Sequence, residues 1–149
     1  MSESLIQNKK AYFNYEILEK FSAGIELFGF EVKALKEKGG SLEGAYTIVR
    51  GGEAYLVGAN ITPLQPKNVP EDYDPRRNRK LLLTKKEIKK LGDAESQKGL
   101  TIVAVSVYNS TKKLKVEIAI ARGKKSFDKR ESIKKRELDR EINRTLKNE

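Results

Sequence analysis

The stretch TIVAVSVYNSTKKLKVEIAI, residues 101–120, decides the fold because it contains two runs of alternating apolar side chains. Val103, Val105 and Val107 share one face of the first run, and residues 114–120 repeat the same spacing. Alternation with a period of two is typical of half-buried β-strands. The segment between the runs is rich in turn-forming residues, so the stretch predicts an antiparallel hairpin with one buried face.

Outward from this hairpin, most of the chain between residues 11 and 121 consists of similar β-prone runs. Residues 45–49 and 53–57 flank Gly51 and Gly52, and a Gly-Gly pair favours a hairpin turn because both residues tolerate a positive φ. Further strands are predicted at residues 12–17 and 25–29. About six short antiparallel strands predict a mainly β fold, either a small closed barrel or a sandwich.

The predicted helices are few and short. Residues 32–38 are expected to form one of them. Thr84, followed three residues later by Glu87, is a capping box that begins a helix at residues 85–91, and Gly92 is expected to end it. The fold is therefore expected to have two or three short helices at its periphery.

The net charge of +10 is concentrated in two segments of the chain. Residues 76–90 carry eight basic side chains and one acidic one, and residues 122–149 carry eleven basic and six acidic side chains. A long loop at residues 63–78 contains all four prolines and leads into the first basic segment. Local concentration of positive charge favours a polyanionic partner, and nucleic acid is the usual one.

The amino-acid composition excludes several classes of function. With no Cys and no His, the chain has no disulfide, no thiolate or imidazole metal ligand, and no Ser-His-Asp or Cys-His catalytic group. Any enzyme would have to work with carboxylates, Lys, Tyr or Arg alone; our expectation is a non-catalytic protein with no metal and no cofactor. No stretch of sequence is long and apolar enough to span a membrane, and the N-terminus lacks the secretory pattern, so we expect a cytoplasmic protein.

One acidic cluster leaves an enzymatic alternative open. Glu71, Asp72 and Asp74 could bind Mg²⁺ and hydrolyse RNA as a carboxylate-metal nuclease. They lie in the proline-rich loop without a partner acid nearby in the sequence, which favours a role in a turn. Glu31 and Lys33 are similarly interpreted as a surface ion pair, although a polar pair at the mouth of a barrel could contact a ligand.

The most specific binding motif is Arg76-Arg77-Asn78-Arg79-Lys80, which is followed by three leucines. Guanidinium groups match phosphate oxygens with paired hydrogen bonds, and the leucines are expected to anchor the segment to the body of the protein. Aromatic residues also lie close to lysines, a pairing expected of surfaces that stack on bases. These residues are Tyr12, Phe13, Tyr15 and Phe127, near Lys9, Lys10, Lys124 and Lys125.

The last segment, residues 126–149, differs in composition from the rest of the chain. If it is helical, three apolar residues spaced four apart form one row and three arginines form a second row on roughly the opposite side. Like charges at this spacing repel each other, so the helix is marginal in free solution. We expect this tail to be disordered alone and helical on a polyanion. The rows are Leu138, Ile142 and Leu146, and Arg136, Arg140 and Arg144.

Four runs of sequence, in order along nearly the whole chain, resemble a known family: NKKA at 8–11, GFEVKAL at 29–35, PRRNRKLLL at 75–83 and GKKSFDKR at 123–130. They are similar to those of the SsrA-binding proteins (small protein B), the tmRNA partners in bacterial trans-translation. The resemblance implies an antiparallel barrel of the oligonucleotide-binding type, residues 1–125, that binds the tRNA-like domain of tmRNA. It also implies a non-catalytic adaptor whose tail, residues 126–149, occupies the empty decoding site and mRNA channel of a stalled ribosome. Small-subunit RNA and the elongation factor that delivers aminoacyl-tmRNA are then further partners.

The resemblance and the basic and aromatic segments together assign two sets of site residues. The residues expected to bind RNA are Asn8, Lys9, Lys10, Arg76, Arg79, Lys80, Leu83, Lys115, Lys124 and Lys125. The tail residues expected at the decoding site are Phe127, Asp128, Lys129, Arg130, Arg136, Arg140 and Arg144. Ser22 stands where the family commonly has Glu, so the RNA contact of that Glu is not assigned here. The alternative within the same general class is a ribosomal protein or translation factor whose barrel binds ribosomal RNA directly.

Overall fold

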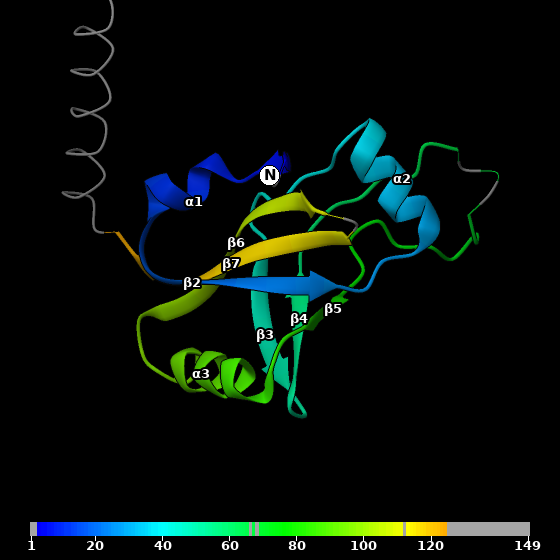
Figure 1. The fold of residues 1–149 in the computed structure, drawn as a ribbon. Helices are drawn as coiled ribbons and strands as arrows, with labels where there is room; N and C mark the ends of the chain where they lie inside the picture. Colours follow the sequence, from blue (N-terminus) through cyan, green and yellow to red (C-terminus); the bar gives the residue numbers. More distant parts are fainter. Residues whose placement is uncertain (1–2, 66, 68, 112, 125–149) are drawn as a thin grey trace, which may run out of the picture.

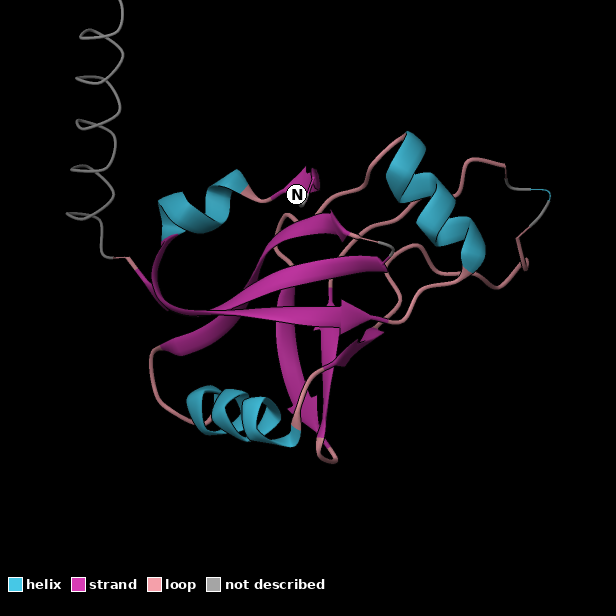
Figure 2. Ribbon diagram, viewed as in Figure 1, coloured by secondary structure: helices cyan, strands magenta, loops and turns pink. Residues whose placement is uncertain are grey.

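The computed structural model describes residues 3–65, 67, 69–111 and 113–124. This part of the chain contains seven β-strands and three short helices, and Figure 2 shows the helices at the periphery of the strands. In chain order the elements are β1 (Glu3–Gln7), α1 (Lys9–Asn14), β2 (Tyr15–Ile25), α2 (Gly29–Glu37), β3 (Tyr46–Arg50), β4 (Glu53–Val57), β5 (Arg79–Leu82), α3 (Lys85–Glu95), β6 (Leu100–Ser110) and β7 (Lys113–Gly123). No helix within these described residues is long and apolar enough to cross a membrane.

The seven strands form one antiparallel sheet in the order β1-β6-β3-β4-β5-β2-β7. Because β6 also pairs with β7, the strand pairings run in a ring through six strands, and β1 joins this ring at β6 (Figure 1). The prediction of a mainly β antiparallel fold is confirmed. The two strands that the sequence pattern did not indicate, β1 and β5, are only five and four residues long.

Both predicted hairpins are confirmed. The strands β6 and β7 pair along their whole length, and β3 pairs with β4 through the turn that contains the two glycines. Gly51 and Gly52 have φ angles of 60° and 75°, in the left-handed region that residues with a Cβ atom rarely adopt. The glycine pair therefore determines this turn, as the sequence indicated.

The strand predicted at residues 12–17 is wrong in its first half, where α1 is found instead. Packing explains the difference. In α1, Ala11 is buried in a small apolar cluster with Val103 and Val105 of β6, which Tyr15 also contacts. The helix covers one face of the sheet, and its partners lie too far away in the sequence for the local aromatic pattern to reveal them.

Two further element boundaries differ from the prediction. Of the strand expected at residues 25–29, only Ile25 lies in a strand, as the last residue of β2. The last residue of the expected strand, Gly29, is instead the first residue of α2. Glu31 accepts a hydrogen bond from the backbone N–H of Phe28 and so caps this earlier helix start. Helix α3 continues through Gly92, since burial of its apolar neighbours outweighs the cost of about 1 kcal/mol for Gly inside a helix.

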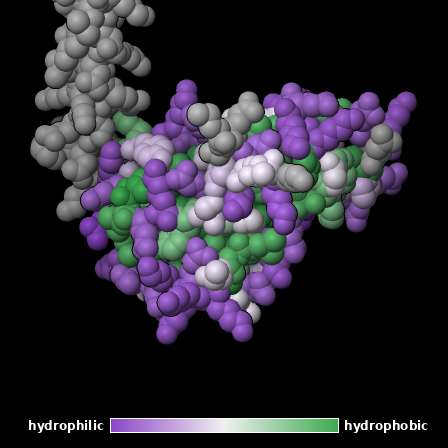
Figure 3. Space-filling model, viewed as in Figure 1, coloured by the Kyte–Doolittle hydropathy of each residue, from purple (hydrophilic) through white to green (hydrophobic). Residues whose placement is uncertain are grey.

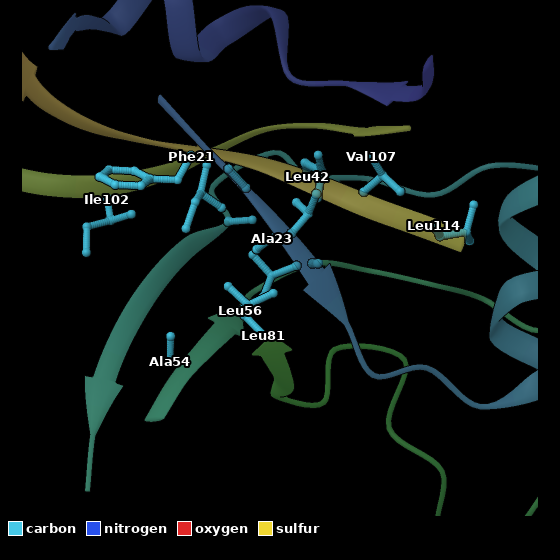
Figure 4. Close-up of a cluster of buried hydrophobic side chains, with 14 of the residues drawn as sticks. Phe21, Ala23, Leu42, Ala54, Leu56, Leu81, Ile102, Val107 and Leu114 are labelled. Carbon is cyan, nitrogen blue, oxygen red and sulfur yellow. The ribbon is translucent and has the colours of Figure 1, made fainter. Parts of the chain in front are cut away.

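The main hydrophobic core is built from inward-facing side chains of the ring of strands. Phe21 of β2, Leu56 of β4, Leu81 of β5 and Ile102 of β6 meet in one buried cluster (Figure 4). The helices α2 and α3 add further buried apolar side chains to it, among them Leu91. The strands of the ring thus contribute to one main core, and the candidates for binding are the exposed side chains of the strands, helices and loops.

Candidate nucleic-acid interface

The side chain of Glu31, near the start of α2, is fully buried and binds three other side chains. Its Oε2 atom lies 2.7 Å from Nη2 of Arg79 and accepts a 2.8 Å hydrogen bond from the hydroxyl of Tyr73. Its Oε1 atom lies 2.6 Å from Nη2 of Arg77 and accepts a 2.8 Å hydrogen bond from the backbone N–H of Phe28. We call Glu31, Tyr73, Arg77 and Arg79 the Glu31 cluster. It ties α2 to β5 and to the loop that precedes β5.

The cluster shifts the pKa values of both of its acidic groups. Burial by itself would raise the pKa of Glu31, because a charged carboxylate is costly in an apolar interior. The hydrogen bonds from Arg77, a backbone N–H, Tyr73 and Arg79 outweigh burial and hold the pKa of Glu31 below its usual range. Burial, followed by the hydrogen bond to Glu31, raises the pKa of Tyr73 to about 12. Near neutral pH the carboxylate is therefore charged and the phenol is protonated.

The raised pKa of Tyr73 predicts a loss of stability in alkali. The folded protein holds the phenolic proton more tightly than the unfolded chain, so the contribution of Tyr73 declines as pH rises from 10.0 to about 12. We expect Tyr73→Phe to be less stable than the parent at neutral pH and the difference to shrink across this window. Urea unfolding of both proteins at each pH measures it. A constant difference across the window would contradict the role given to the hydroxyl.

Arg79 is fully buried, and its guanidinium binds groups inside the protein. Besides the contact with Glu31, its nitrogens donate hydrogen bonds of 2.9 Å to the backbone carbonyls of Ala59 and Pro75. That Arg79 contacts RNA stays a prediction, and the full burial of its side chain favours a structural role. The interpretation of Glu31 and Lys33 as a surface ion pair is wrong, because the carboxylate is buried and pairs with arginines.

The neighbours of this buried arginine keep their side chains accessible. Arg76 and Asn78 are exposed, and Lys80 is half-buried with its Nζ atom 3.4 Å from the carboxylate of Glu53. The acidic cluster around Asp74 forms a turn, since Asp74 accepts a 2.9 Å hydrogen bond from the backbone N–H of Arg76. In the part of the chain that the structure describes, no group of three or more acidic side chains is arranged to hold a metal ion. The exposed side chain of Arg76 thus lies next to an acidic turn, and the loop at residues 63–78 carries three basic and three acidic residues in all.

The leucines that follow this motif differ in their exposure. In β5, Arg79 and Leu81 point into the protein and Leu82 points out, with 52% of its surface exposed. Leu83, which was expected to bind RNA, is half-buried and packs against the main core. Leu82 is therefore the leucine that a ligand can reach, and the alternation of the strand was the signal that could have identified it.

A groove of about 250 Å³ lies beside Leu82, where β5, β2, β7 and α2 meet. We call it the Leu82 groove. Its lining combines apolar side chains such as Leu27 with the three lysines Lys36, Lys113 and Lys115. Lys115 was predicted, whereas Lys36 and Lys113 lie outside the basic segments and come together only through the strand order. Figure 3 shows exposed apolar surface bordered by hydrophilic side chains on the face seen in Figure 1.

Of the RNA-binding residues predicted near the N-terminus, one is buried and hydrogen-bonded to the protein, and the other two are exposed. The side-chain amide of Asn8 is buried and donates hydrogen bonds of 3.0 and 2.9 Å to the backbone carbonyls of Leu42 and Ala104. Its amide nitrogen thus holds the start of α1 on the sheet. Lys9 and Lys10 are exposed on α1, and Lys10 forms a 2.6 Å ion pair with Glu43.

The predicted pairing of aromatic rings with lysines is found in a different form. Tyr12 is exposed, and the Nζ atom of Lys20 lies 5.1 Å from its ring centroid. Lys124 donates a 3.0 Å hydrogen bond to the backbone carbonyl of Tyr12. Tyr15 packs in the apolar cluster under α1. The other predicted residues, Lys125, Phe127, Asp128, Lys129, Arg130, Arg136, Arg140 and Arg144, lie outside the described residues.

Ser22, at the position where a Glu is common in the family that the sequence resembles, lies on β2 among polar side chains. Its hydroxyl forms a hydrogen bond with the hydroxyl of Tyr108. Glu117 on β7 stands directly opposite Ser22, and its carboxylate lies 3.4 Å from Nζ of Lys20. A carboxylate is therefore present beside this position, although it comes from the neighbouring strand.

Comparison with known proteins gives consistent similarities over nearly the whole chain. The family model described as SmpB protein matches residues 5–148. An SsrA-binding protein of Thermosipho africanus is 50% identical over 141 residues, which is 94% of both chains. An SsrA-binding protein of Pseudomonas entomophila is 46% identical over 145 residues, 97% of this chain and 91% of the relative. A solved structure described as "tmRNA-SmpB: a journey to the center of the bacterial ribosome" is similar with a TM-score of 0.69 and 40% identity, over 86% of this chain and 93% of that chain.

Proposed function

The chain belongs to the SmpB family, and on this premise we propose that its described fold holds the tRNA-like domain of tmRNA while its tail acts on the ribosome. It is a tmRNA-binding protein of trans-translation that works with the ribosome, and it is not an enzyme. This function takes the place of the two alternatives, a barrel protein that binds only ribosomal RNA and a metal-dependent nuclease.

The observation that carries the proposed binding mode is the Leu82 groove. Lysine ammonium groups bind phosphates, and a half-exposed apolar side chain such as Leu82 contacts riboses or base faces. Lys113 and Lys115 lie on the same strand and line the groove together. Arg76, exposed on the loop before β5, extends the basic surface. A folded RNA recognised through its backbone and shape fits this combination better than a base-specific ligand does.

We infer that the ring of strand pairings is a closed barrel of the oligonucleotide-binding type. The pairing of β6 with β7 supports this inference because it joins the last strand of the order back to β6 and completes a ring of six strands, and the core lies among the strands of the ring. Residues 1–125 then form one RNA-binding domain and residues 126–149 a separate tail.

For the tail we propose a role at the empty decoding site and mRNA channel, against small-subunit RNA. Its arginine row suits phosphates, and the like-charge repulsion within the row becomes attraction when the tail folds as a helix on RNA. An elongation factor that carries aminoacyl-tmRNA completes the complex. Because the proposed function takes place on ribosomes, we propose that the protein acts in the cytoplasm.

Replacing Lys113 and Lys115 together by Ala tests the proposed binding mode. We expect weaker tmRNA binding and a salt dependence whose slope falls by about 0.7–0.9 for each lost phosphate contact, because fewer counterions are released. Filter binding over a series of salt concentrations measures both quantities. Lys98→Ala is the matched control, since Lys98 is exposed on the turn between α3 and β6. Figure 1 shows this turn beside α3, away from the beginning of β7, the strand that carries Lys113 and Lys115. An unchanged affinity and slope in the double variant would contradict the placement of RNA at this groove.

A further inference from the structure

Phe28, the residue before α2, serves neither the helix cap nor the core. Helix N-caps favour Ser, Thr, Asp or Asn, whose side-chain oxygens accept a backbone hydrogen bond, and the Phe28 ring makes no such bond. The side chain is also 49% exposed, so burial does not explain its presence. A residue that departs from the usual N-cap preference without adding to capping or to the core is expected at a functional site.

The Phe28 ring is held in a stack with an arginine. The Cζ atom of Arg77 lies 4.1 Å from the ring centroid, and the centroid of Phe30 lies 5.5 Å away with the two ring planes at 31°. Arg77 is fixed in turn by Glu31, which lies 2.6 Å from its Nη2 atom and 3.2 Å from its Nε atom. The ring of Phe30 packs edge-on against Tyr73 at 4.8 Å. The Glu31 cluster thus sets the position of the Phe28–Arg77 pair before any ligand binds.

The pair is continuous with the Leu82 groove. Leu27, the residue before Phe28, lines the groove, and α2 also contributes Lys36 to it. On the loop that reaches Phe28, Arg76 is exposed and carries a positive charge, whereas the charge of Arg77 is paired with Glu31. Unpaired bases stack on aromatic rings and guanidinium planes, and the interaction tolerates any base because every base has a π face. When the backbone of an RNA lies in the lysine-lined groove, the ring of Phe28 and the guanidinium of Arg77 are therefore suited to stack on the base of a neighbouring nucleotide.

We propose that an unpaired base of the bound tmRNA stacks on the Phe28–Arg77 pair. This inference rests on the proposed function, since RNA backbone in the Leu82 groove brings a nucleotide to the pair. The pair selects an unpaired nucleotide over a duplex, because the faces of paired bases are covered by their neighbours in the stack.

Phe28→Ala is expected to weaken tmRNA binding about 5- to 150-fold, the range for the loss of one base–aromatic stack. The slope of the salt dependence stays unchanged, because no phosphate contact is lost. Phe28→Trp is expected to retain parental affinity. Tyr46→Ala is the matched control, since Tyr46 is 43% exposed on β3 and is also an aromatic residue. Parental affinity in Phe28→Ala, or a reduced salt slope, would overturn the inference.

The Phe28→Trp variant reports stacking at position 28 directly through its fluorescence, because the parent chain contains no tryptophan. We expect a tmRNA transcript to quench its fluorescence with the same midpoint as binding, and to leave a Tyr46→Trp reporter unquenched. Binding without quenching at position 28 would overturn the stack, and quenching by ribosomes alone would overturn the assignment to tmRNA. A parent protein that does not bind tmRNA would overturn the proposed function as well, so the two failures are distinguishable.

Discussion

Replacing Glu31 by Ala is expected to lower the free energy of unfolding by about 3–5 kcal/mol, the range found when one partner of a buried ion pair is removed. Arg79 would remain in the interior without a counter-charge, and Arg77 would lose the carboxylate that lies 2.6 Å from it. Urea unfolding followed by circular dichroism measures the change. A loss within about 0.5 kcal/mol, as for an ordinary surface substitution, would contradict the structural role of the Glu31 cluster.

The ion pair between Lys10 and Glu43 is the matched control for this experiment. Its charged atoms are also 2.6 Å apart, but the two side chains are 66% and 65% exposed. Water and salt screen an exposed pair, so Glu43→Ala is expected to unfold nearly like the parent protein. The contrast between the two variants compares a buried, multiply bonded carboxylate with an exposed one that pairs with a single lysine.

The dependence of the unfolding free energy on acidic pH is a second measurement of the Glu31 cluster. The pKa of Glu31 is lower in the folded protein than in the unfolded chain. Its stabilisation is therefore present above the ordinary carboxyl pKa and is lost as the pH falls through the pKa of the folded state. The difference in unfolding free energy between the parent and Glu31→Ala is expected to narrow in acid.

Deleting residues 126–149 is expected to abolish peptide tagging on stalled ribosomes and to leave tmRNA affinity largely intact. The reason is the separation of roles: the Leu82 groove and the Phe28–Arg77 pair lie within the described fold, whereas the proposed decoding-site contacts lie in the tail. A reconstituted trans-translation reaction measures tagging, and filter binding measures affinity.

Two full-length variants serve as finer tests of the tail. Arg140→Glu reverses a charge in the arginine row, and Ile142→Pro breaks a helix if one forms. Both are expected to impair tagging without changing tmRNA affinity or thermal stability. Loss of tmRNA binding on deletion of the tail, or normal tagging by the Pro variant, would contradict this division of roles.

The parts of the fold that the sequence predicted are those with strong local signals. The alternation of residues 101–120 and the Gly51-Gly52 turn each predict a hairpin without reference to distant residues, and both hairpins are present. The first half of residues 12–17 was assigned wrongly because α1 depends on packing against β6, far away in the chain. A short aromatic run does not distinguish a strand from a buried helix.

The candidate site was less predictable because its electrostatics are non-local. Arg79 and Leu81 lie on the same face of β5, so the alternation of the strand could have predicted that Arg79 is buried. We did not expect this, because burying a guanidinium without a counter-charge costs too much free energy. Its counter-charge, Glu31, is 48 residues away in the sequence, and only the folded structure shows that the two side chains form an ion pair. The same holds for Lys36 and Lys113, which the strand order brings to the Leu82 groove.

The central claim is that tmRNA lies over the Leu82 groove and the adjacent Phe28–Arg77 pair. Ultraviolet crosslinking of the protein–tmRNA complex, followed by mass spectrometry of the crosslinked peptides, tests it most directly. The account predicts crosslinks in peptides that contain Phe28, Leu82 and Lys115. Crosslinks confined to α3 and the turn around Lys98, with none in those peptides, would contradict it.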